Sequence, residues 1–383
     1  MNLKLFFSPV DAQIFETIDD QSSFFNGIRV SSDTMPDVKD IDIAIIGLTE
    51  TRGGEGEGLA KAADEIRKKL YRLKKGNRPC KIVDLGNMNN GMDLEETQNR
   101  LREVCEMLID NNILPLIIGG SHDLDYGQFR AYEGMKKLVS ILNVDAKLDM
   151  NEKSSNENNK HIHKMLLHEP NFLFNYSHLA YQSYLIDPAH VALLERLYFE
   201  AYRLGHLREH IKEMEPIIRD ADMMTFDISA IKSVDAPGSA DPQAFGLTGE
   251  EACQICWYAG LNEKLSSVGF YEYNPDFDDD NKKTASVIAT MLWYFVEGFS
   301  NRKSELDFKT NDYMKYVVSM SSEPETIIFY KSKLSEKWWL EVPHPDHSKY
   351  DRNSIVPCNY SDYEEATKGN IPERWINTYS KLI

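Results

Sequence analysis

Four polar residues are spaced so that they could bind a metal ion together. His122 follows the apolar run ILPLIIGG, Asp145 and Asp149 follow LVSILNV, and Asp227 follows MMTF. Positions 145 and 149 point to one side of an extended segment. Crowded carboxylates cannot all ionise without a compensating cation, and Asp oxygens with one imidazole suit a divalent ion of the Mn type. The alternative is that each Asp caps a loop or a helix, which explains one such residue more readily than the whole set.

Three more polar residues accompany this set. Lys147 lies between the two aspartates of DAKLD, Ser229 follows the run TFDI, and Glu272 follows VGFY. A protonated lysine has no lone pair with which to bind a metal ion, but its ammonium group could neutralise the carboxylates. Lys147 is therefore a candidate catalytic residue and not a candidate metal ligand.

Alternating strands and helices must position these residues. The sequence predicts apolar strands over residues 41–48, 81–86, 113–120, 138–146, 223–229 and 265–275, with one or two more in 171–186. It predicts amphipathic helices over 93–112, 187–205, 247–260 and 283–300. Such alternation indicates βαβ units and a parallel sheet. Binding sites in parallel sheets form beyond the carboxyl ends of the strands, which is where the polar residues fall.

The pattern changes after residue 302. The runs MKYVVSMS, TIIFYKS and KWWLEVP predict an antiparallel hairpin or meander, and SDYEEATKGNIPERWINTY predicts a terminal helical piece. We therefore predict a main α/β domain over residues 1–302 and a C-terminal extension over 303–383 that packs on it.

Composition excludes some classes of partner. The formal net charge is −18, with 42% hydrophobic and 27% charged residues. A field of this sign repels phosphate backbones, so we expect a small-molecule substrate, no nucleic acid and no membrane. No run of about eighteen apolar residues predicts a transmembrane helix, and the first residues lack the apolar core of a signal peptide. The expected location is the cytoplasm.

Cysteine usage fits a reducing compartment. The five cysteines are scattered, and only Cys253 and Cys256 form a C-x-x-C pair. Such a pair could be half of a zinc site or a redox motif. It falls inside the predicted helix over 247–260, however, and no second pair exists. We interpret both as helix residues without chemistry.

The order of the motifs resembles a known family. GGxH, then DAxxD, then FDI…APG, then ExNP occur in the order and spacing of the ureohydrolase superfamily, which includes arginase, agmatinase and formiminoglutamase. The resemblance covers roughly residues 40–300 and is closest to formiminoglutamase-like proteins. It implies a three-layer α/β/α arginase-like fold with a mostly parallel sheet, here followed by the antiparallel extension.

The resemblance also implies a metal centre, from which this chain departs. In the family two Mn²⁺ ions share one site, and the first is bound by the residues that match His122, Asp145, Asp149 and Asp227. The second ion uses a histidine and an aspartate where this chain has Lys147 and Ser229, and Lys232 stands where the same motif has a further aspartate. We therefore predict one Mn²⁺ at most, or none if lysine replaces the charge of the metal.

The same resemblance suggests residues that act on the substrate. Glu272 matches a glutamate that faces the substrate, although a strand-end salt bridge would also explain it. His163 lies near the position of a proton-shuttle histidine. No HG motif is present, however, so His161 is an equal candidate and a solvated loop histidine is an alternative. Ser229 is a candidate substrate-binding residue.

Two functions are compatible with these residues. The first is a hydrolase that cleaves a linear C–N bond of a formimino or guanidino compound with metal-activated water. A lysine beside the site would repel a cationic guanidinium, which favours a formiminoglutamate-like substrate. The second is a metal-poor or metal-free pseudoenzyme that binds a protein partner. Relatives are often oligomers, so the resemblance also implies a homo-oligomer.

Overall fold

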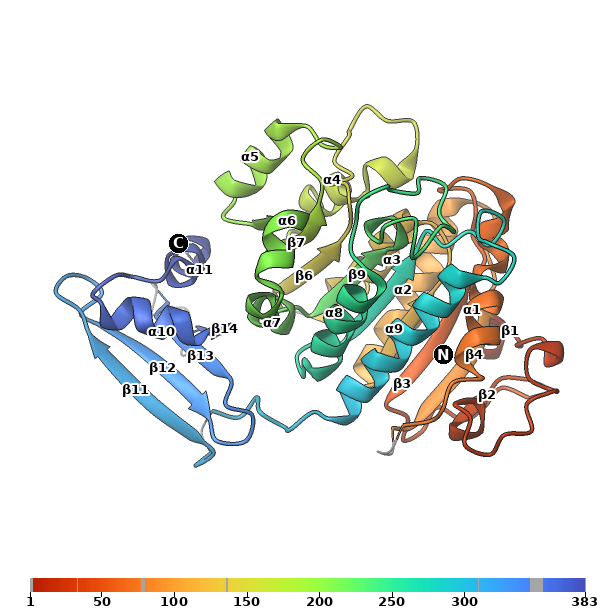
Figure 1. Cartoon of the computed structure of the whole chain (residues 1–383), viewed down its shortest axis with the longest axis horizontal. Coiled ribbons are helices and arrows are strands. Elements are labelled where there is room, and N and C mark those ends of the chain that lie inside the picture. The colour runs from red at the N-terminus through yellow and green to blue at the C-terminus, as the bar shows by residue number, and fades with distance from the viewer. Residues whose placement is uncertain are drawn as a thin grey trace.

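A computed structural model describes residues 3–32, 34–76, 80–135, 137–308, 310–344 and 354–382 (Figure 1). Its central sheet has ten strands, which are β1 (Phe7–Ser8), β2 (Ile28–Val30), β3 (Ile43–Leu48), β4 (Ile82–Met88), β5 (Leu114–Ile118), β6 (Val139–Val144), β7 (Leu173–Tyr181), β8 (Glu200–Arg203), β9 (Met223–Asp227) and β10 (Ser267–Tyr271). Their order is β1-β4-β3-β5-β10-β9-β6-β7-β8, and β2 also pairs with β4. Only β1 runs antiparallel to its neighbour among these paired strands. The predicted mostly parallel sheet is therefore confirmed.

Helices cover both faces of this sheet, as the three-layer prediction requires. One apolar cluster joins the sheet to α1 (Ala62–Leu70), α6 (Leu204–Glu209), α7 (Glu215–Arg219), α8 (Gly249–Leu261) and α9 (Lys283–Ser300). On the other face lie α2 (Leu94–Asp110), α3 (Asp125–Arg130), α4 (His161–Leu166) and α5 (Pro188–Arg196). The central strands are buried on both faces because they are almost continuously apolar. No helix in the described part of the chain is both long and apolar enough to cross a bilayer.

The helix predicted over 187–205 is only partly correct. The structure has α5 over Pro188–Arg196, and the chain then turns at Tyr198, whose φ is 57°. It continues as the edge strand β8, which pairs with β7. The segment EAYR contains residues that either element accepts, and the free edge of β7 decides between them. Tertiary pairing thus overrides the local helical periodicity.

The strand ends that carry the polar residues are neighbours in the sheet. β5, β10, β9 and β6 are consecutive in the sheet order. Because these four strands are parallel, their carboxyl ends meet at one edge. His122, Glu272, Asp227 and Asp145 follow or end these strands in that order. The topology alone therefore brings the four side chains together.

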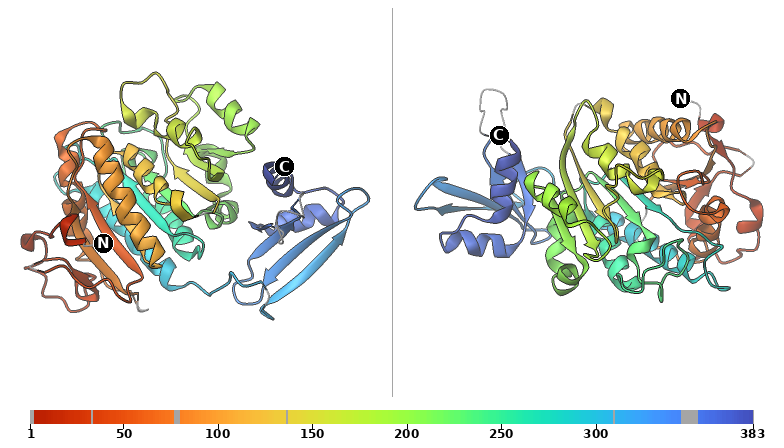
Figure 2. Two further views of the ribbon diagram at one scale, coloured as in Figure 1. Left: turned by 180° about the vertical axis from the view of Figure 1, so that it is seen from behind. Right: turned by 90° about the horizontal axis from the view of Figure 1, so that it is seen from above.

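A second, smaller sheet follows α9. Its antiparallel strands are β11 (Tyr313–Ser319), β12 (Thr326–Ser332), β13 (Trp338–Val342) and β14 (Ser354–Cys358), and the helices α10 (Tyr360–Thr367) and α11 (Glu373–Leu382) pack on it. We call the described residues after 302 the C-terminal module. All views in Figures 1 and 2 place it to one side of the main body, at the far end from the N-terminal strands. The predicted antiparallel element and terminal helical piece are present, the latter as two helices.

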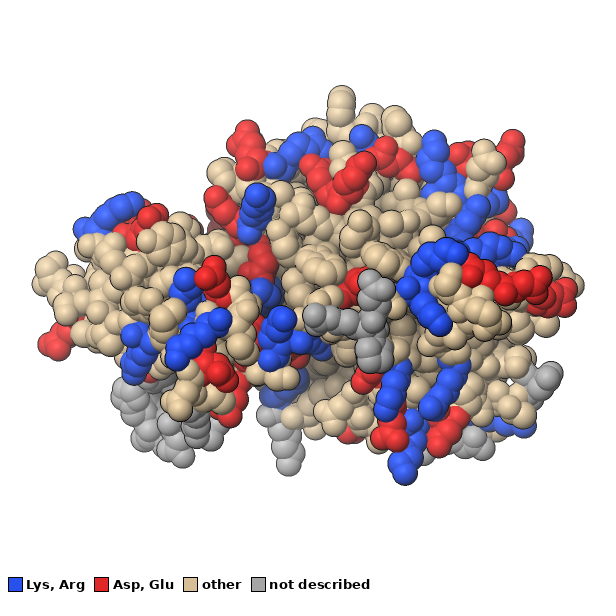
Figure 3. Space-filling view, turned by 60° about the horizontal axis from the view of Figure 1, so that its bottom comes forward, with Lys and Arg blue, Asp and Glu red and all other residues tan. Residues whose placement is uncertain are grey.

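Arg219, the last residue of α7, holds the C-terminal module against the main body. Its guanidinium stacks 4.2 Å from the ring centroid of Trp339 and donates to the Trp338 carbonyl at 3.1 Å. Glu215 accepts from Arg219 at 3.0 Å and forms an ion pair with Lys337, also at 3.0 Å. Figure 3 shows acidic and basic side chains together where the two parts meet. The contact therefore combines stacking with a partly buried ion network.

The Glu215 network predicts a pH dependence. Burial alone would raise the pKa of Glu215, but Arg219 and Lys337 together lower it below the ordinary 4.5. A carboxylate with a lowered folded-state pKa stabilises the fold above its unfolded pKa and loses this effect as the pH falls. We expect Glu215→Gln to cost about 1.5–3 kcal/mol at pH 7, the range for hydrogen bonds to charged groups. The difference in unfolding free energy from the wild type should shrink below pH 4.5, and a difference that stays constant would contradict this assignment.

Candidate metal centre

His122 lies just beyond β5, after a turn made by two glycines. Gly119 and Gly120 have φ angles of 84° and 79°, in the left-handed region that side chains rarely adopt. The turn carries the His122 ring into a fully buried position. There its Nδ1 lies 3.6 Å from Asp145 Oδ2 and 3.5 Å from Asp227 Oδ2. The structure therefore brings together three of the four predicted ligands.

The backbone fixes both carboxylates in this arrangement. Asp145 Oδ1 accepts a hydrogen bond from the Lys147 backbone N–H at 3.0 Å. Asp227 Oδ1 accepts one from the Ser229 backbone N–H at 2.6 Å. The other oxygen of each carboxylate faces His122. The three residues thus present ligand atoms that lie within 4.8 Å of one another.

These ligand atoms fit a divalent cation. His122 Nδ1 and Asp145 Oδ2 are buried, and neither has a hydrogen-bond partner among the described residues. Unpartnered buried polar atoms are rare because losing water costs free energy. Burial and the charge of Asp149 raise the pKa of Asp145. Burial opposes a charge on His122, but Asp145 and Asp227 raise its pKa well above 6.5. A cation between these atoms would satisfy both carboxylates and the imidazole.

Asp149, the fourth predicted ligand, lies at the rim of this group. Its φ is 43°, which is strained for a residue with a side chain. Its Oδ2 lies 3.4 Å from His161 Nε2. It is close enough to Asp145 for its charge to raise that pKa, but it is not among the atoms that converge on His122. Strained backbone of this kind clusters at functional sites.

Lys147 does not occupy the metal position. Its ammonium forms an ion pair with Asp241, on the loop before α8. Ser229 is buried and contributes its backbone N–H to Asp227, and Lys232 pairs with Asp235 at 3.4 Å. The Lys147 ammonium therefore does not lie among the carboxylates of the centre, where it would replace the charge of a metal ion. These side chains also provide no imidazole or carboxylate for a second ion.

Glu272 contacts the centre through the backbone. Its φ is 65°, and its Oε1 accepts a hydrogen bond from the His122 backbone N–H at 2.9 Å. The side chain is buried, and burial together with the charge of Asp227 raises its pKa to about 8. It is therefore part of the same site. No salt bridge involving Glu272 occurs among the described residues, which disfavours the strand-end salt bridge considered for it.

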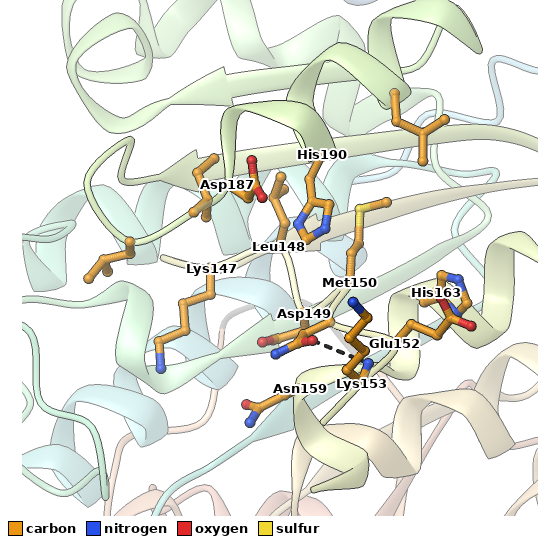
Figure 4. Close-up of a pocket in the computed structure, with 14 residues that line it drawn as sticks. Lys147, Leu148, Asp149, Met150, Glu152, Lys153, Asn159, His163, Asp187 and His190 are labelled. Carbon is orange, nitrogen blue, oxygen red and sulfur yellow. Dashed lines mark hydrogen bonds between the residues drawn. The ribbon is translucent and has the colours of Figure 1, made fainter. Parts of the chain in front are cut away.

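A cavity of about 720 Å³ opens beside the centre. In Figure 4, Asp149 is drawn between Lys147 and His163, with His190 above them. His163 thus lines the cavity, as a residue that meets a substrate must. His161, the other candidate, is fully buried and does not line the cavity. Asp149 is the one predicted ligand in the lining, so it connects the cavity to the metal centre.

Three buried residues of the site lie outside the predicted ligand and substrate-binding sets. Asp125 and His161 form, with His122, a second group whose ligand atoms converge within 4.8 Å. Thr225 Oγ1 lies 2.7 Å from His122 Nε2. Asp125 begins a helix, where aspartate is common, and Thr225 belongs to an apolar strand. Neither carries a sequence signal of its own, although the KHIHK segment did point to His161 as an alternative.

Comparison with known proteins places this geometry in a family. The model of the arginase family matches residues 41–297. Formimidoylglutamase of Staphylococcus aureus is 25% identical over 261 residues, covering 66% of this chain and 82% of the relative. A structure of Trypanosoma cruzi formiminoglutamase with Mn²⁺ aligns with a TM-score of 0.64 and 25% identity, over 70% of this chain and 96% of that one. Formimidoylglutamase from Bacillus subtilis shares the fold, with a TM-score of 0.66 and 18% identity over 75% of this chain and 95% of that one. The chain belongs to the arginase family.

Proposed function

We propose that this protein hydrolyses a C–N bond of a formimino compound, with formiminoglutamate as the favoured substrate and one Mn²⁺ as cofactor. The convergence of His122 Nδ1, Asp145 Oδ2 and Asp227 Oδ2 beside a cavity carries the proposal. The relatives named as formimidoylglutamases support the choice of substrate. A homo-oligomeric assembly and a cytoplasmic location stay predictions.

The position of each residue in the centre indicates its role in the reaction. His122, Asp145 and Asp227 would hold the ion, with Asp149 reaching it from the rim. A bound Mn²⁺ supplies Lewis acidity and makes hydroxide available at neutral pH. Glu272 is fixed through one oxygen by the His122 backbone N–H, which leaves its other oxygen to hydrogen-bond to an amidine nitrogen and so orient the substrate. Water adds to the amidine carbon, one C–N bond breaks, and the departing nitrogen takes up a proton.

The cavity wall carries charges of both signs, from Lys147 and Lys153 and from Asp149, Glu152 and Asp187. Burial opposes the charge of Lys147, but Asp241 raises its pKa above the ordinary 10.5, so the side chain is cationic at neutral pH. Lys153 also lines the cavity. Opposite charges at short range attract. The two lysines therefore offer partners to a compound with carboxylates at its far end, such as formiminoglutamate, and the preference for this compound over arginine or agmatine rests on the named relatives.

The metal-free pseudoenzyme is the second candidate, and the relatives named as formimidoylglutamases disfavour it. In a metal-free site the protonated His122 ring, whose pKa Asp145 and Asp227 raise, is the cation that faces the carboxylates. Lys147, the cation nearest in sequence, pairs with Asp241 outside the group. The buried oxygen of Asp145 is left without a partner among the described residues.

A substrate panel tests the proposal. The Mn²⁺-loaded protein is incubated with formiminoglutamate, arginine, agmatine and guanidinobutyrate, and free glutamate, ammonia and urea are measured separately. We expect turnover of formiminoglutamate alone, with loss of turnover after chelation and recovery with Mn²⁺. The glutamate and ammonia readings show which C–N bond breaks. Absence of turnover of all four compounds by the loaded protein would overturn the enzyme proposal.

A further inference from the structure

A buried hydrogen-bonded chain continues from the far side of the His122 ring. His122 Nε2 lies 2.7 Å from Thr225 Oγ1, and the Thr225 hydroxyl lies 3.3 Å from Asp125 Oδ2. The second oxygen of Asp125 lies 2.7 Å from His161 Nδ1. All four side chains are fully buried. None of them lines the cavity.

The direction of each hydrogen bond follows from the ligand position of His122. Nδ1 faces the carboxylates of Asp145 and Asp227, and it must be free of a proton to bind an ion. The proton of the neutral ring is then on Nε2 and is donated to Thr225 Oγ1. The Thr225 hydroxyl then donates its own proton in a hydrogen bond to Asp125 Oδ2. Asp125 therefore determines, through Thr225, which nitrogen of His122 is available to the metal.

His161 connects the same carboxylate to the other side of the centre. Its Nδ1–H donates to Asp125 Oδ1, and its ring lies 4.4 Å from the His122 ring, centroid to centroid. Its Nε2 faces Asp149 Oδ2 at 3.4 Å. The buried pair of Asp125 and His161 thus reaches His122 at one end, through Thr225, and Asp149 at the other.

We propose that Asp125 and His161 are positioning residues that preorganise the metal centre, Asp125 by fixing the His122 tautomer through Thr225 and His161 by holding Asp149. The inference rests on the proposed function, because it assumes that the centre binds an ion. Partners of this kind, which contact metal ligands and not the metal, orient the ligands and typically contribute 10–100-fold to metal affinity. In this chain the pair is made by residues outside the ligand motifs.

A second metal ion between His122, Asp125 and His161 is the competing interpretation, since their ligand atoms also converge. It would require His122 to give up the Nε2 proton while Nδ1 binds the first ion, which makes the ring an imidazolate. Asp125 Oδ1 and His161 Nδ1 are already at hydrogen-bond distance, 2.7 Å. The arrangement is that of a carboxylate–histidine hydrogen bond, and we expect no ion there.

The test measures Mn²⁺ affinity, by equilibrium dialysis with elemental analysis, in variants that keep side-chain shape. We expect Asp125→Asn and Thr225→Val to weaken binding by about 10–100-fold, and Thr225→Ser to retain it. His161→Phe keeps a ring against His122 without its nitrogens and should also weaken binding. Ser267→Ala is the matched control, since it removes an equally buried hydroxyl from the neighbouring strand β10. Unchanged affinity in Thr225→Val and Asp125→Asn would overturn the proposal, as would two ions in the wild type with one in His161→Phe.

Nitrogen NMR of the metal-free protein separates this inference from the proposed function. With ¹⁵N-labelled histidine, and at a pH where the His122 imidazolium favoured by Asp145 and Asp227 has lost one proton, we expect the neutral ring to carry its proton on Nε2 in the wild type. Thr225→Val should shift the His122 signals towards mixed tautomers, and Thr225→Ser should restore them. If the wild type binds no Mn²⁺ but shows this behaviour, the proposed function fails and the positioning role stands. A His122 tautomer that does not respond to Thr225 or Asp125 refutes the positioning role, whatever the metal content.

Discussion

Asp145→Asn abolishes Mn²⁺-dependent hydrolysis without destabilising the metal-free fold. The substitution replaces Oδ2, which faces His122 Nδ1 at 3.6 Å, by an amide NH₂ that cannot bind a metal. We expect Mn²⁺ affinity and turnover to fall by about 10³-fold or more. This loss exceeds the roughly 10–100-fold that is typical when a residue that contacts only a metal ligand is removed. The amide keeps an acceptor for the Lys147 backbone N–H, and once Asp145 no longer raises the pKa of His122 the ring can lose one proton and accept from the new NH₂ at Nδ1. The unfolding free energy of the metal-free protein should therefore stay within about 1 kcal/mol of the wild type.

Asp222→Asn is the matched control for this prediction. Asp222 is as buried as Asp145 but lies at the opposite end of the sheet, where it accepts from the Ser140 backbone N–H at 2.9 Å. It also pairs with Lys137 and Lys264. Its substitution should lower stability and leave Mn²⁺ affinity unchanged. If the centre is where we place it, metal titration and urea unfolding show that Asp145→Asn loses Mn²⁺ affinity and Asp222→Asn loses stability. Similar changes in both variants would contradict this position of the centre.

Arg67→Met should destabilise the protein more than any substitution outside the site considered above. Arg67 is fully buried on α1, and its guanidinium binds both oxygens of Asp84, at 2.8 and 2.9 Å. Asp84 also accepts from Tyr71 at 2.8 Å. Removing the cation leaves a buried charge without compensation, which costs about 3–5 kcal/mol. Urea unfolding measures this loss directly.

The double variant Arg67→Met with Asp84→Leu tests the cause of that loss. Replacing both partners of a buried ion pair by apolar residues is often neutral or stabilising. We expect the double variant to recover most of the stability that the single variant loses. If the double variant is less stable than Arg67→Met, the loss comes from packing or from the donors of Tyr71 and Gly86 that Asp84 accepts, and not from the unpaired carboxylate of Asp84.

The sequence predicted those parts of the site that lie at strand ends. His122, Asp145 and Asp227 each follow an apolar strand, and parallel pairing brings such ends together whatever the loops do. Asp149 was harder to place, because its position depends on a left-handed backbone angle that the alternation of an extended segment does not describe. The direction of Lys147 depends on Asp241, which is distant in sequence.

Other features depended on contacts that no local pattern contains. Strand β8 forms inside a segment with helical periodicity because the edge of β7 is free to pair. The link between Thr225, Asp125 and His161 joins three separate elements through single hydrogen bonds. Residues of this kind have ordinary roles in their own elements, as a helix start or a strand residue. Only the folded chain shows that they meet behind His122.

The number of Mn²⁺ ions per chain tests the central claim most directly. The protein is saturated with Mn²⁺, freed of loosely bound metal by gel filtration, and analysed for manganese against protein concentration. Lys147→His with Ser229→Asp, which supplies the side chains that the family uses for its second ion, is the reference for higher occupancy. We predict one equivalent in the wild type and a value approaching two in the double variant. Two equivalents in the wild type, or none, would contradict a centre built from His122, Asp145 and Asp227 for a single ion.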